Sequence, residues 1–290
     1  MKTILQGEDD LQIKKEPSSN NFNQNIYWIN DFPPPRISVI TVCFNSANTI
    51  RHTLESIKNQ TYLNIEHIII DGASTDKTLQ IVQDFTHVSK VISERDKGIF
   101  DAMNKGIRYA SGDIIGILNS DDVYANDDVL GVVADTFQTT GTDTLYGDLQ
   151  YVHPRNMSMV LRRWKSGKYH LNKFKYGWMP PHPTFFVKKE VYRKAGLFDT
   201  TLKTAADYEF MLRTLYKYQF SCDYVPKVLV KMAAGGASNV SLNARLNANR
   251  EDRRAWAING LTPYFFTLYL KPARKIFQFI NKEQLRRAFF

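Results

Sequence analysis

The sequence predicts an α/β fold, in which a mostly parallel sheet is flanked by helices and followed by a C-terminal helical extension. Short β-branched, apolar runs alternate with helical segments from Ile37 onward. Strands that alternate with helices at this spacing form right-handed crossovers and a parallel sheet that helices cover on both faces. With 290 residues and 43% hydrophobic composition, the chain is long enough to bury a substantial core.

Three regions are expected along the chain. Residues 1–35 form an N-terminal extension, because they lack sustained periodicity and end in the stiff spacer Pro33-Pro34-Pro35. Residues 36–238 form the main domain. Residues 239–290 form a basic, amphipathic helical region.

The elements of the main domain follow in order from local patterns. A β-branched run at 37–44 precedes Asn45-Ser46, which can cap a helix over 47–59. The same alternation then repeats twice, before a fourth strand. The expected strands are 37–44, 65–70, 88–93 and 113–118, with helices over 47–59, from Asp76 to about 85, and over 99–110. Further helices are expected at 127–138, 189–195 and 206–218, and further strands at 144–152, 157–163, 185–187 and 225–232.

Polar residues follow each of the first four strands. Asn45, Asp71, Glu94 with Asp96, and Asn119-Ser120-Asp121-Asp122 come directly after them. In an open parallel sheet these loops meet at the carboxyl edge, where ligands bind. So many carboxylates on one rim raise one another's pKa values unless a cation compensates. This rim is the candidate active site.

Charge and cysteine content narrow the class of protein. The net charge is +9, and the residues from Arg245 onward contribute ten basic and three acidic side chains. Because the excess lies in the tail rather than in a stripe along the domain, a nucleic-acid binder is disfavoured. Cys43 and Cys222 suggest neither a disulfide framework nor a metal site. With no signal pattern and no membrane-length apolar stretch, we expect a cytoplasmic protein.

Six segments together resemble a known family. They are ISVITVCFN, IIIDGASTD, ERDKGIFDAMNKGI, GDIIGILNSDD, PHPTFF and AADYEFMLR, and they run from about Arg36 to Ser238. Their order and spacing resemble the family 2 glycosyltransferases of the Rossmann-like GT-A fold, especially bacterial enzymes of exopolysaccharide and lipopolysaccharide synthesis. The dinucleotide, P-loop, zincin and hydrolase motifs GxGxxG, GxxxxGK[ST], HExxH and GxSxG do not occur at a strand-to-helix junction.

The resemblance implies a donor site on the rim. Thr41 and Asn45 would border the nucleotide base, and Asp71 would accept hydrogen bonds from the base or ribose. Asp96 would lie near the ribose or diphosphate. Alternatively, Asp71 has only a structural role in the DGAST turn, and Asp96 has only a structural role as a cap of the following helix.

The resemblance also implies a divalent cation. Asn119-Ser120-Asp121 aligns with the family's DxD element, in which the last carboxylate binds Mn²⁺ or Mg²⁺ between the donor's phosphates. Oxygen ligands and a hard cation suit a diphosphate leaving group. Asn119 departs from the commoner Asp, and Asp122 is either a further ligand or an acceptor-side group. An Asp-rich turn without metal is the alternative.

Two later residues complete the expected site. Asp207 matches the family's base position, although Ala206 replaces the preceding Glu, and it could also favour the helix N-terminus as a charge. Glu209 ranks below it. His182 lies in a loop that the family places beside the acceptor or diphosphate. Trp164 and Trp178 could stack on acceptor sugars or only pack, and Gly235-Gly236-Ala237-Ser238 resembles a flexible segment over the donor phosphates.

The expected activity is an inverting transfer of a sugar from a nucleotide-sugar to a hydroxyl of a glycan or lipid-linked glycan. UDP-sugars are the expected donors, because they dominate the family that the sequence resembles. The alternatives are a nucleotidyltransferase, or a non-catalytic nucleotide-sugar or glycan-binding module, which would be favoured if Asp207 lay far from the rim.

The aromatic and basic tail from Leu261 onward resembles an interfacial helix pair. It could bring the protein to the inner face of an anionic membrane, or it could pack on the main domain.

Overall fold

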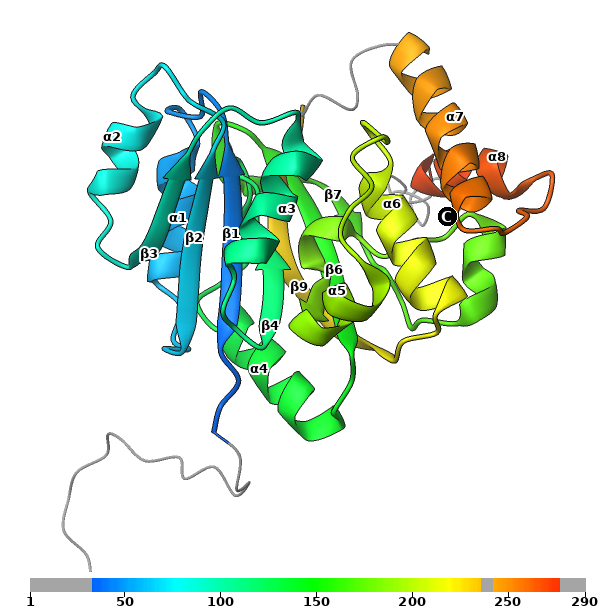
Figure 1. The fold of residues 1–290 in the computed structure, drawn as a ribbon, viewed down its shortest axis with the longest axis horizontal. Helices are drawn as coiled ribbons and strands as arrows, with labels where there is room; N and C mark the ends of the chain where they lie inside the picture. The colour runs from blue at the N-terminus through cyan, green and yellow to red at the C-terminus, as the bar shows by residue number, and fades with distance from the viewer. Residues whose placement is uncertain (1–32, 236–241, 277–290) are drawn as a thin grey trace, which may run out of the picture. The chain divides into compact units, whose positions relative to one another are not determined.

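One sheet organises the molecule (Figure 1), and the computed structural model describes residues 33–235 and 242–276. Its strands are β1 (Ile37–Cys43), β2 (Ile65–Asp71), β3 (Val88–Ser93), β4 (Ile114–Ile117), β5 (Val123–Tyr124), β6 (Thr144–His153), β7 (Asn156–Trp164), β8 (Phe186–Lys188) and β9 (Cys222–Ala233). The spatial order is β3-β2-β1-β4-β8-β6-β9-β5, and β7 pairs with β6.

The sheet has a parallel half and a mixed half. β1 pairs in parallel with both β2 and β4, and β2 pairs in parallel with β3, which confirms the parallel pairing that the sequence predicts for this part of the sheet. Beyond β4, β8 is antiparallel to both β4 and β6, while β9 is parallel to β6. β5, which the sequence pattern did not indicate, pairs antiparallel with β9 directly after the polar segment 119–122.

Helices cover both faces of the sheet. They are α1 (Ile50–Lys58), α2 (Thr78–Gln83), α3 (Ile99–Tyr109), α4 (Val129–Thr140), α5 (Lys189–Ala195), α6 (Ala206–Met211), α7 (Leu242–Ile258) and α8 (Thr267–Ile276). α1 begins three residues later than the expected start at Ala47. The expected helix over 206–218 divides into α6 and a π-helical segment, Leu212–Lys217. Short 3-10 helices at Leu171–Tyr176 and His182–Thr184 were not expected.

Alternation along the central strands assigns each face its helices. Ile68 and Ile70 belong to the cluster that includes α3, α5 and α6. Ile69, between them, packs with α1 and α2. α3 lies close to the sheet at Gly106, where a Cβ atom would stand 2.4 Å from the Ile40 side chain. Only glycine permits this approach.

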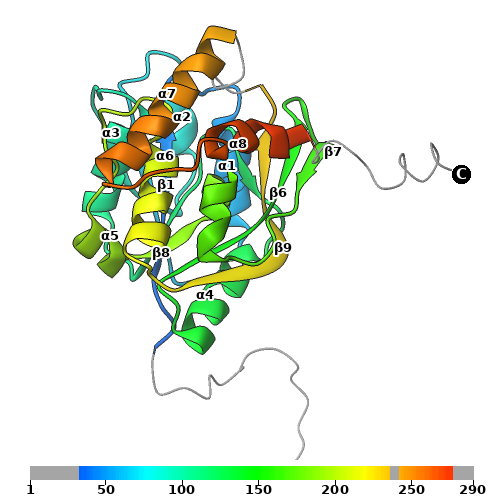
Figure 2. The same cartoon turned by 90° about the vertical axis from the view of Figure 1, so that its right-hand side faces the viewer.

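The C-terminal helices pack on the main domain (Figure 2). Ala255 and Trp256 of α7 and Leu268 of α8 are buried in the same cluster as α6. The indole N–H of Trp256 donates to the Tyr208 hydroxyl at 2.9 Å. The packed alternative therefore holds for α7 and the described part of α8, while residues 277–290 lie outside the described range. Within the described residues, no helix is both long and apolar enough to cross a membrane.

Candidate active site

The loops after the parallel strands meet at one edge and are tied together by hydrogen bonds. The backbone N–H of Asn45 donates to Ser74 Oγ at 2.8 Å, and Asn45 Oδ1 accepts from the N–H of Thr75 at 2.9 Å. Ser120 Oγ donates to Ser46 Oγ at 2.9 Å. The segments after β1, β2 and β4 are thereby joined, so the rim exists as the sequence predicts.

Asp71 is buried at the centre of this rim. One carboxylate oxygen accepts from Ser74 Oγ at 2.5 Å, and the other accepts from the Ser74 N–H at 3.0 Å and from Ser93 Oγ at 2.6 Å. Asp71 therefore organises the DGAST turn and links it to the end of β3. Its expected contact with a nucleotide stays a prediction, and would require some of these hydrogen bonds to break.

Thr41 is also enclosed. Its side chain is buried, and its hydroxyl lies 3.0 Å from His67 Nε2. His67 Nδ1 lies in turn 3.1 Å from His87 Nε2. Thr41, His67 and His87 therefore form a chain of polar contacts. Burial lowers the pKa of His67 to about 3, so this imidazole is neutral at pH 7. Contact between the Thr41 side chain and a donor stays a prediction.

Asp96 lies over the same rim. One of its oxygens accepts from the N–H of Gly98 at 2.9 Å, and the other stands where a Cβ atom on Gly72 would be 2.7 Å away. Glycine at 72 therefore lets the third loop approach the second. The half-buried Asp96 carboxylate lies beside the turn that Asp71 organises, and its donor role stays a prediction.

The segment 119–122 forms a tight turn that buries Asp122. The N–H of Asp122 donates to the Asn119 carbonyl at 3.1 Å, and Thr53 Oγ donates to the Asp122 carbonyl at 2.8 Å. The Asp122 side chain is fully buried, and burial, followed by the neighbouring Asp121 charge, raises its pKa well above its ordinary value. Burial also raises the pKa of Asp121.

The donor set of this turn suits a hard divalent cation. Among the described residues, neither carboxylate oxygen of Asp122 has a hydrogen-bond partner of good geometry, and the buried Asn119 Oδ1 has none. Unpaired buried oxygens are costly unless a ligand or ion satisfies them. No group of three or more His, Cys, Asp or Glu side chains in the described part of the chain could hold a metal by itself. Mg²⁺ typically needs only one or two carboxylates, together with waters and substrate phosphates.

His182 and Asp207 meet across the site from distant parts of the chain. His182 Nδ1 lies 3.2 Å from Asp207 Oδ2, and the two side chains are 34% and 20% exposed. His182 is also close enough to Asp121 for its positive form to lower the pKa of that carboxyl, against the larger effect of burial. Asp207 therefore lies near the carboxylate rim, which is contrary to the expectation for a non-catalytic binding module.

Glu209 has a structural place. It is buried, and its carboxylate accepts from Arg213 at 2.8 and 2.9 Å and from Asn259 at 3.0 Å. These bonds join α6 to the following π-helical segment and to the end of α7. The lower rank given to Glu209 agrees with this position.

The loop before Asp207 is held by α7. Glu251 accepts from the N–H of Lys203 at 3.0 Å and from the N–H and hydroxyl of Thr204, each at 2.6 Å. These bonds lower the pKa of Glu251, although partial burial acts against them. No local sequence pattern predicts this contact, because Glu251 lies 47 residues beyond Thr204.

Tyr151 and Arg162 are further polar groups beside the site that sequence reasoning missed. The Arg162 guanidinium lies 3.7 Å from the centre of the Tyr151 ring across the β6–β7 pairing. Burial raises the pKa of Tyr151, and the Asp122 and Asp207 charges add to the increase. The only sequence signal for these two residues is the aromatic and basic composition of the segment that contains them. Trp178 packs instead of lining the site, since it is buried and its indole N–H donates to the Ser166 carbonyl at 3.0 Å.

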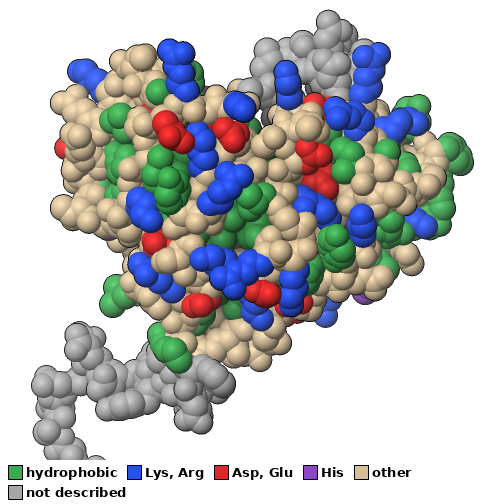
Figure 3. All heavy atoms as spheres, in the orientation of Figure 1, with side chains coloured by type: hydrophobic (Ala, Val, Ile, Leu, Met, Phe, Trp, Pro, Cys, Tyr) green, Lys and Arg blue, Asp and Glu red, His purple; other side chains and the backbone are tan. Residues whose placement is uncertain are grey.

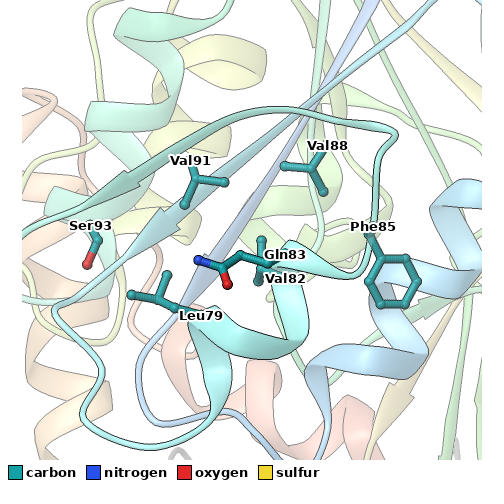
Figure 4. A pocket seen from close by; sticks show the side chains of 7 residues that line it. All are labelled: Leu79, Val82, Gln83, Phe85, Val88, Val91 and Ser93. Carbon is teal, nitrogen blue, oxygen red and sulfur yellow. The ribbon is translucent and has the colours of Figure 1, made fainter.

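A hollow in the described part of the chain lies away from this site. A cavity of about 380 Å³ lies between α2 and β3, lined mainly by apolar side chains such as Val82, Phe85 and Val91 (Figure 4). Neither the carboxylates of the rim nor His182 line it. Gly236, Ala237 and Ser238, expected to form a flexible segment over the phosphates, fall outside the described residues.

Comparison with known proteins identifies the family. The model for "Glycosyl transferase family 2" matches residues 38–196, more than half of the chain. An uncharacterized glycosyltransferase of Mycobacterium tuberculosis (strain ATCC 25618 / H37Rv) is 33% identical over 196 residues, covering 62% of this chain and 68% of the relative. A PGL/p-HBAD biosynthesis glycosyltransferase of Mycobacterium bovis (strain BCG / Pasteur 1173P2) is 28% identical over 211 residues, covering 71% and 80%.

Solved structures agree on the fold. S. aureus TarS 1–349 in complex with UDP-GlcNAc aligns with a TM-score of 0.63 at 20% identity, covering 81% of this chain and 69% of TarS. The mannosyltransferase PcManGT from Pyrobaculum calidifontis, in complex with GDP-Man and Mn²⁺, aligns with a TM-score of 0.59 at 21% identity, covering 83% and 71%. The chain has the GT-A-type α/β fold with a C-terminal helical part, and it belongs to glycosyl transferase family 2.

Proposed function

We propose that this family 2 glycosyltransferase transfers a sugar from a nucleotide-sugar, with UDP-sugars as the first donors to test, to a hydroxyl of a glycan or lipid-linked glycan, with inversion at the anomeric carbon. The main support is the arrangement around His182, which contacts Asp207 and is close enough to Asp121 for its positive form to lower the pKa of that carboxyl. A proton acceptor and a leaving-group site thus belong to one site, where a sugar bound between them would meet the acceptor on one face and lose the diphosphate from the other, as a single displacement requires.

The donor proposal draws on the rim and on the names of related structures. Complexes with UDP-GlcNAc and with GDP-Man and Mn²⁺ describe those neighbours. For this chain, Asn45, Asp71 and Asp96 are proposed to border the nucleoside, with Asp121 and Asp122 on the diphosphate side. Thr41, at its position in β1, is also proposed to border the nucleotide base.

Asp121, Asp122 and Asn119 are the residues proposed to hold Mn²⁺ or Mg²⁺. When bound, such an ion stabilises the negative charge that develops on a departing diphosphate. Asp122 supports this proposal most directly, because its buried carboxylate lacks hydrogen-bond partners of good geometry among the described residues. Burial and the neighbouring Asp121 charge disfavour the ionised form of Asp122, and a bound cation would relieve this cost.

Asp207 is proposed as the general base. The acceptor oxygen attacks the anomeric carbon while the bond from that carbon to the diphosphate breaks, and the diphosphate leaves with the bonding electron pair. The Asp207 carboxylate takes the proton from the acceptor hydroxyl. His182 fixes the orientation of the carboxylate through its 3.2 Å contact.

We also propose a cytoplasmic location, as expected from the two cysteines, which are both free thiols. A peripheral position at the inner face of the membrane would suit a lipid-linked acceptor.

A panel of UDP-, GDP-, CMP- and TDP-sugars, screened for transfer and hydrolysis in the presence of Mn²⁺, tests the donor class. ¹H NMR of the first product formed then gives its anomeric configuration. Inversion is expected, and a product that retains the donor's configuration would refute the single displacement. No turnover with any sugar, together with release of pyrophosphate from nucleoside triphosphates and sugar phosphates, would favour the nucleotidyltransferase alternative.

A further inference from the structure

Four aromatic rings gather at the connection between α7 and α8, and we call Tyr176, Tyr264, Phe265 and Phe266 the aromatic patch. Ring centroids lie 5.9 Å apart for Tyr176 and Phe266, 5.3 Å for Tyr264 and Phe266, and 5.2 Å for Phe265 and Phe266. Phe265 is 88% exposed, and Tyr269, nearby in the first turns of α8, is 64% exposed. Aromatic surface of this extent is unusual on a protein that meets only water.

The elements beneath the patch are firmly packed, so the exposure does not result from a loose segment. The hydroxyl of Thr267 donates to the Lys175 carbonyl at 2.5 Å, and Leu268 is buried in the main core. At Gly177 a Cβ atom would stand 2.5 Å from the backbone nitrogen of Lys271, which shows how closely α8 approaches the 3-10 helix Leu171–Tyr176. Two segments 92 residues apart therefore form one fixed surface.

The surroundings of the patch are positively charged. Neither of the two sequence segments that build it, 149–189 and 253–276, contains Asp or Glu. Lys175 Nζ lies 4.7 Å from the centre of the Tyr264 ring, and Arg274 is exposed on α8. In Figure 3, hydrophobic and basic side chains lie together at the end of the molecule where α7 and α8 are joined. Lys271 does not add to this field, because it pairs with Asp252 at 2.6 Å.

We propose that the aromatic patch and its lysine and arginine neighbours bind the interface of an anionic lipid bilayer. Phenol and phenyl rings suit the boundary between headgroups and acyl chains, and basic side chains are attracted by anionic headgroups. A second copy of the chain would bring two equally charged surfaces together, which is unfavourable. Charge complementarity therefore selects the bilayer.

The proposed membrane contact differs from that of an isolated tail anchor, because Tyr176, which is part of the aromatic patch, comes from the middle of the chain. Tyr176 stands six residues before His182 in the sequence. The same segment thus reaches from the membrane surface to the active site, which would bring a lipid-linked acceptor near Asp207. Bilayer binding itself does not depend on the proposed glycosyl transfer, and it can be measured without donor or acceptor.

Vesicle sedimentation of the full chain tests the proposal. The wild-type protein should sediment with vesicles of 70% phosphatidylcholine and 30% phosphatidylglycerol at 0.1 M salt, and much less with pure phosphatidylcholine or at 0.5 M salt. The double variant Phe265→Ser/Tyr269→Ser and the double variant Lys175→Gln/Arg274→Gln should each reduce the partition coefficient about tenfold or more. The matched control is Leu63→Ser, which removes a 90% exposed apolar side chain elsewhere and should bind like wild type.

Circular dichroism and thermal melting check that the variants are folded, which we expect because Phe265, Tyr269 and Arg274 are exposed and Lys175 is half-buried. Wild-type binding by the Phe265→Ser/Tyr269→Ser variant would overturn the proposal, and would assign any vesicle binding to residues 277–290. Light scattering without lipid provides a second check. A wild-type dimer that this variant converts to a monomer, with vesicle binding unchanged, would assign the patch to a second copy and also overturn it.

Discussion

Asp207 Oδ2 lies 3.2 Å from His182 Nδ1, although 25 residues separate the two in the chain. The contact joins the first turn of α6 to the 3-10 helix that follows Pro181. Both side chains are partly exposed, so an acceptor hydroxyl can reach them.

Replacement of Asp207 by Asn keeps the shape of the side chain and removes the proton acceptor. Turnover should fall about 10²–10⁴-fold, while donor affinity changes little, because the base acts in the transition state. Steady-state kinetics and donor titration by calorimetry measure the two effects. Glu209→Gln is an unsuitable control because Glu209 is buried, whereas Glu190→Gln changes an exposed carboxylate and should leave turnover unchanged. Near-normal turnover of the Asp207 variant would refute the assignment.

His182 and Asp207 should act as one unit. If His182 only orients the carboxylate, then His182→Ala lowers turnover in the wild-type background but costs little more once Asp207 is already Asn. Groups that act together show such non-additive effects. A double-mutant cycle on kcat measures the coupling. Fully additive losses would mean that His182 has a separate role.

Donor binding should depend on a divalent cation through Asp121. A nucleoside diphosphate should bind more tightly with Mn²⁺ than with EDTA, because an ion held by Asp121 would offset the negative charge of the diphosphate. Asp121→Ala should remove this difference, while Asp127→Ala, an exposed carboxylate later in the same region, should not. Calorimetric titration with and without Mn²⁺ checks both variants. Equal wild-type affinity in the two conditions contradicts the prediction.

Glu251 should influence turnover through the loop before Asp207. Glu251→Gln weakens three hydrogen bonds to Lys203 and Thr204, and hydrogen bonds to charged groups contribute about 1.5–3 kcal/mol each. We expect kcat to fall about tenfold with little change in donor KM. Arg253→Gln, exposed on the same helix, is the control. A variant that loses only thermal stability, with kcat unchanged, would reduce Glu251 to a structural role.

The buried His67 should make stability depend on pH. Burial and then His87 lower its pKa from 6.5 to about 3, so the unfolded chain binds a proton more readily than the folded one. The contribution of the neutral His67 to stability is complete above pH 6.5 and is lost as the pH falls toward 3. By pH 5, the loss in the free energy of unfolding amounts to roughly 2 kcal/mol. Urea unfolding at pH 7.5 and 5 should show a smaller difference for His67→Gln than for wild type. An identical pH dependence in both proteins would contradict the assignment.

Local sequence determined the parallel half of the fold and the membership of the rim. β3 and α5 match their expected bounds, and β2 differs from its expected range only by Asp71. Alternation and β-branched runs report burial directly, and strands that alternate with helices indicate parallel pairing through right-handed crossovers. Asn45, Asp71, Asp96 and Asn119–Asp122 could therefore be assigned to one edge without any contact being known.

Tertiary structure alone decided which of these polar groups are already satisfied. Asp71 and Asp122 both follow strands and look alike in sequence, yet Ser74 and Ser93 bind the first, and the second has buried oxygens without partners of good geometry among the described residues. The contacts of Asp207 with His182 and of Glu251 with Thr204 likewise join residues 25 and 47 positions apart. A sequence pattern reports periodicity and propensity within one element, whereas hydrogen bonds and burial depend on side chains that only folding brings together.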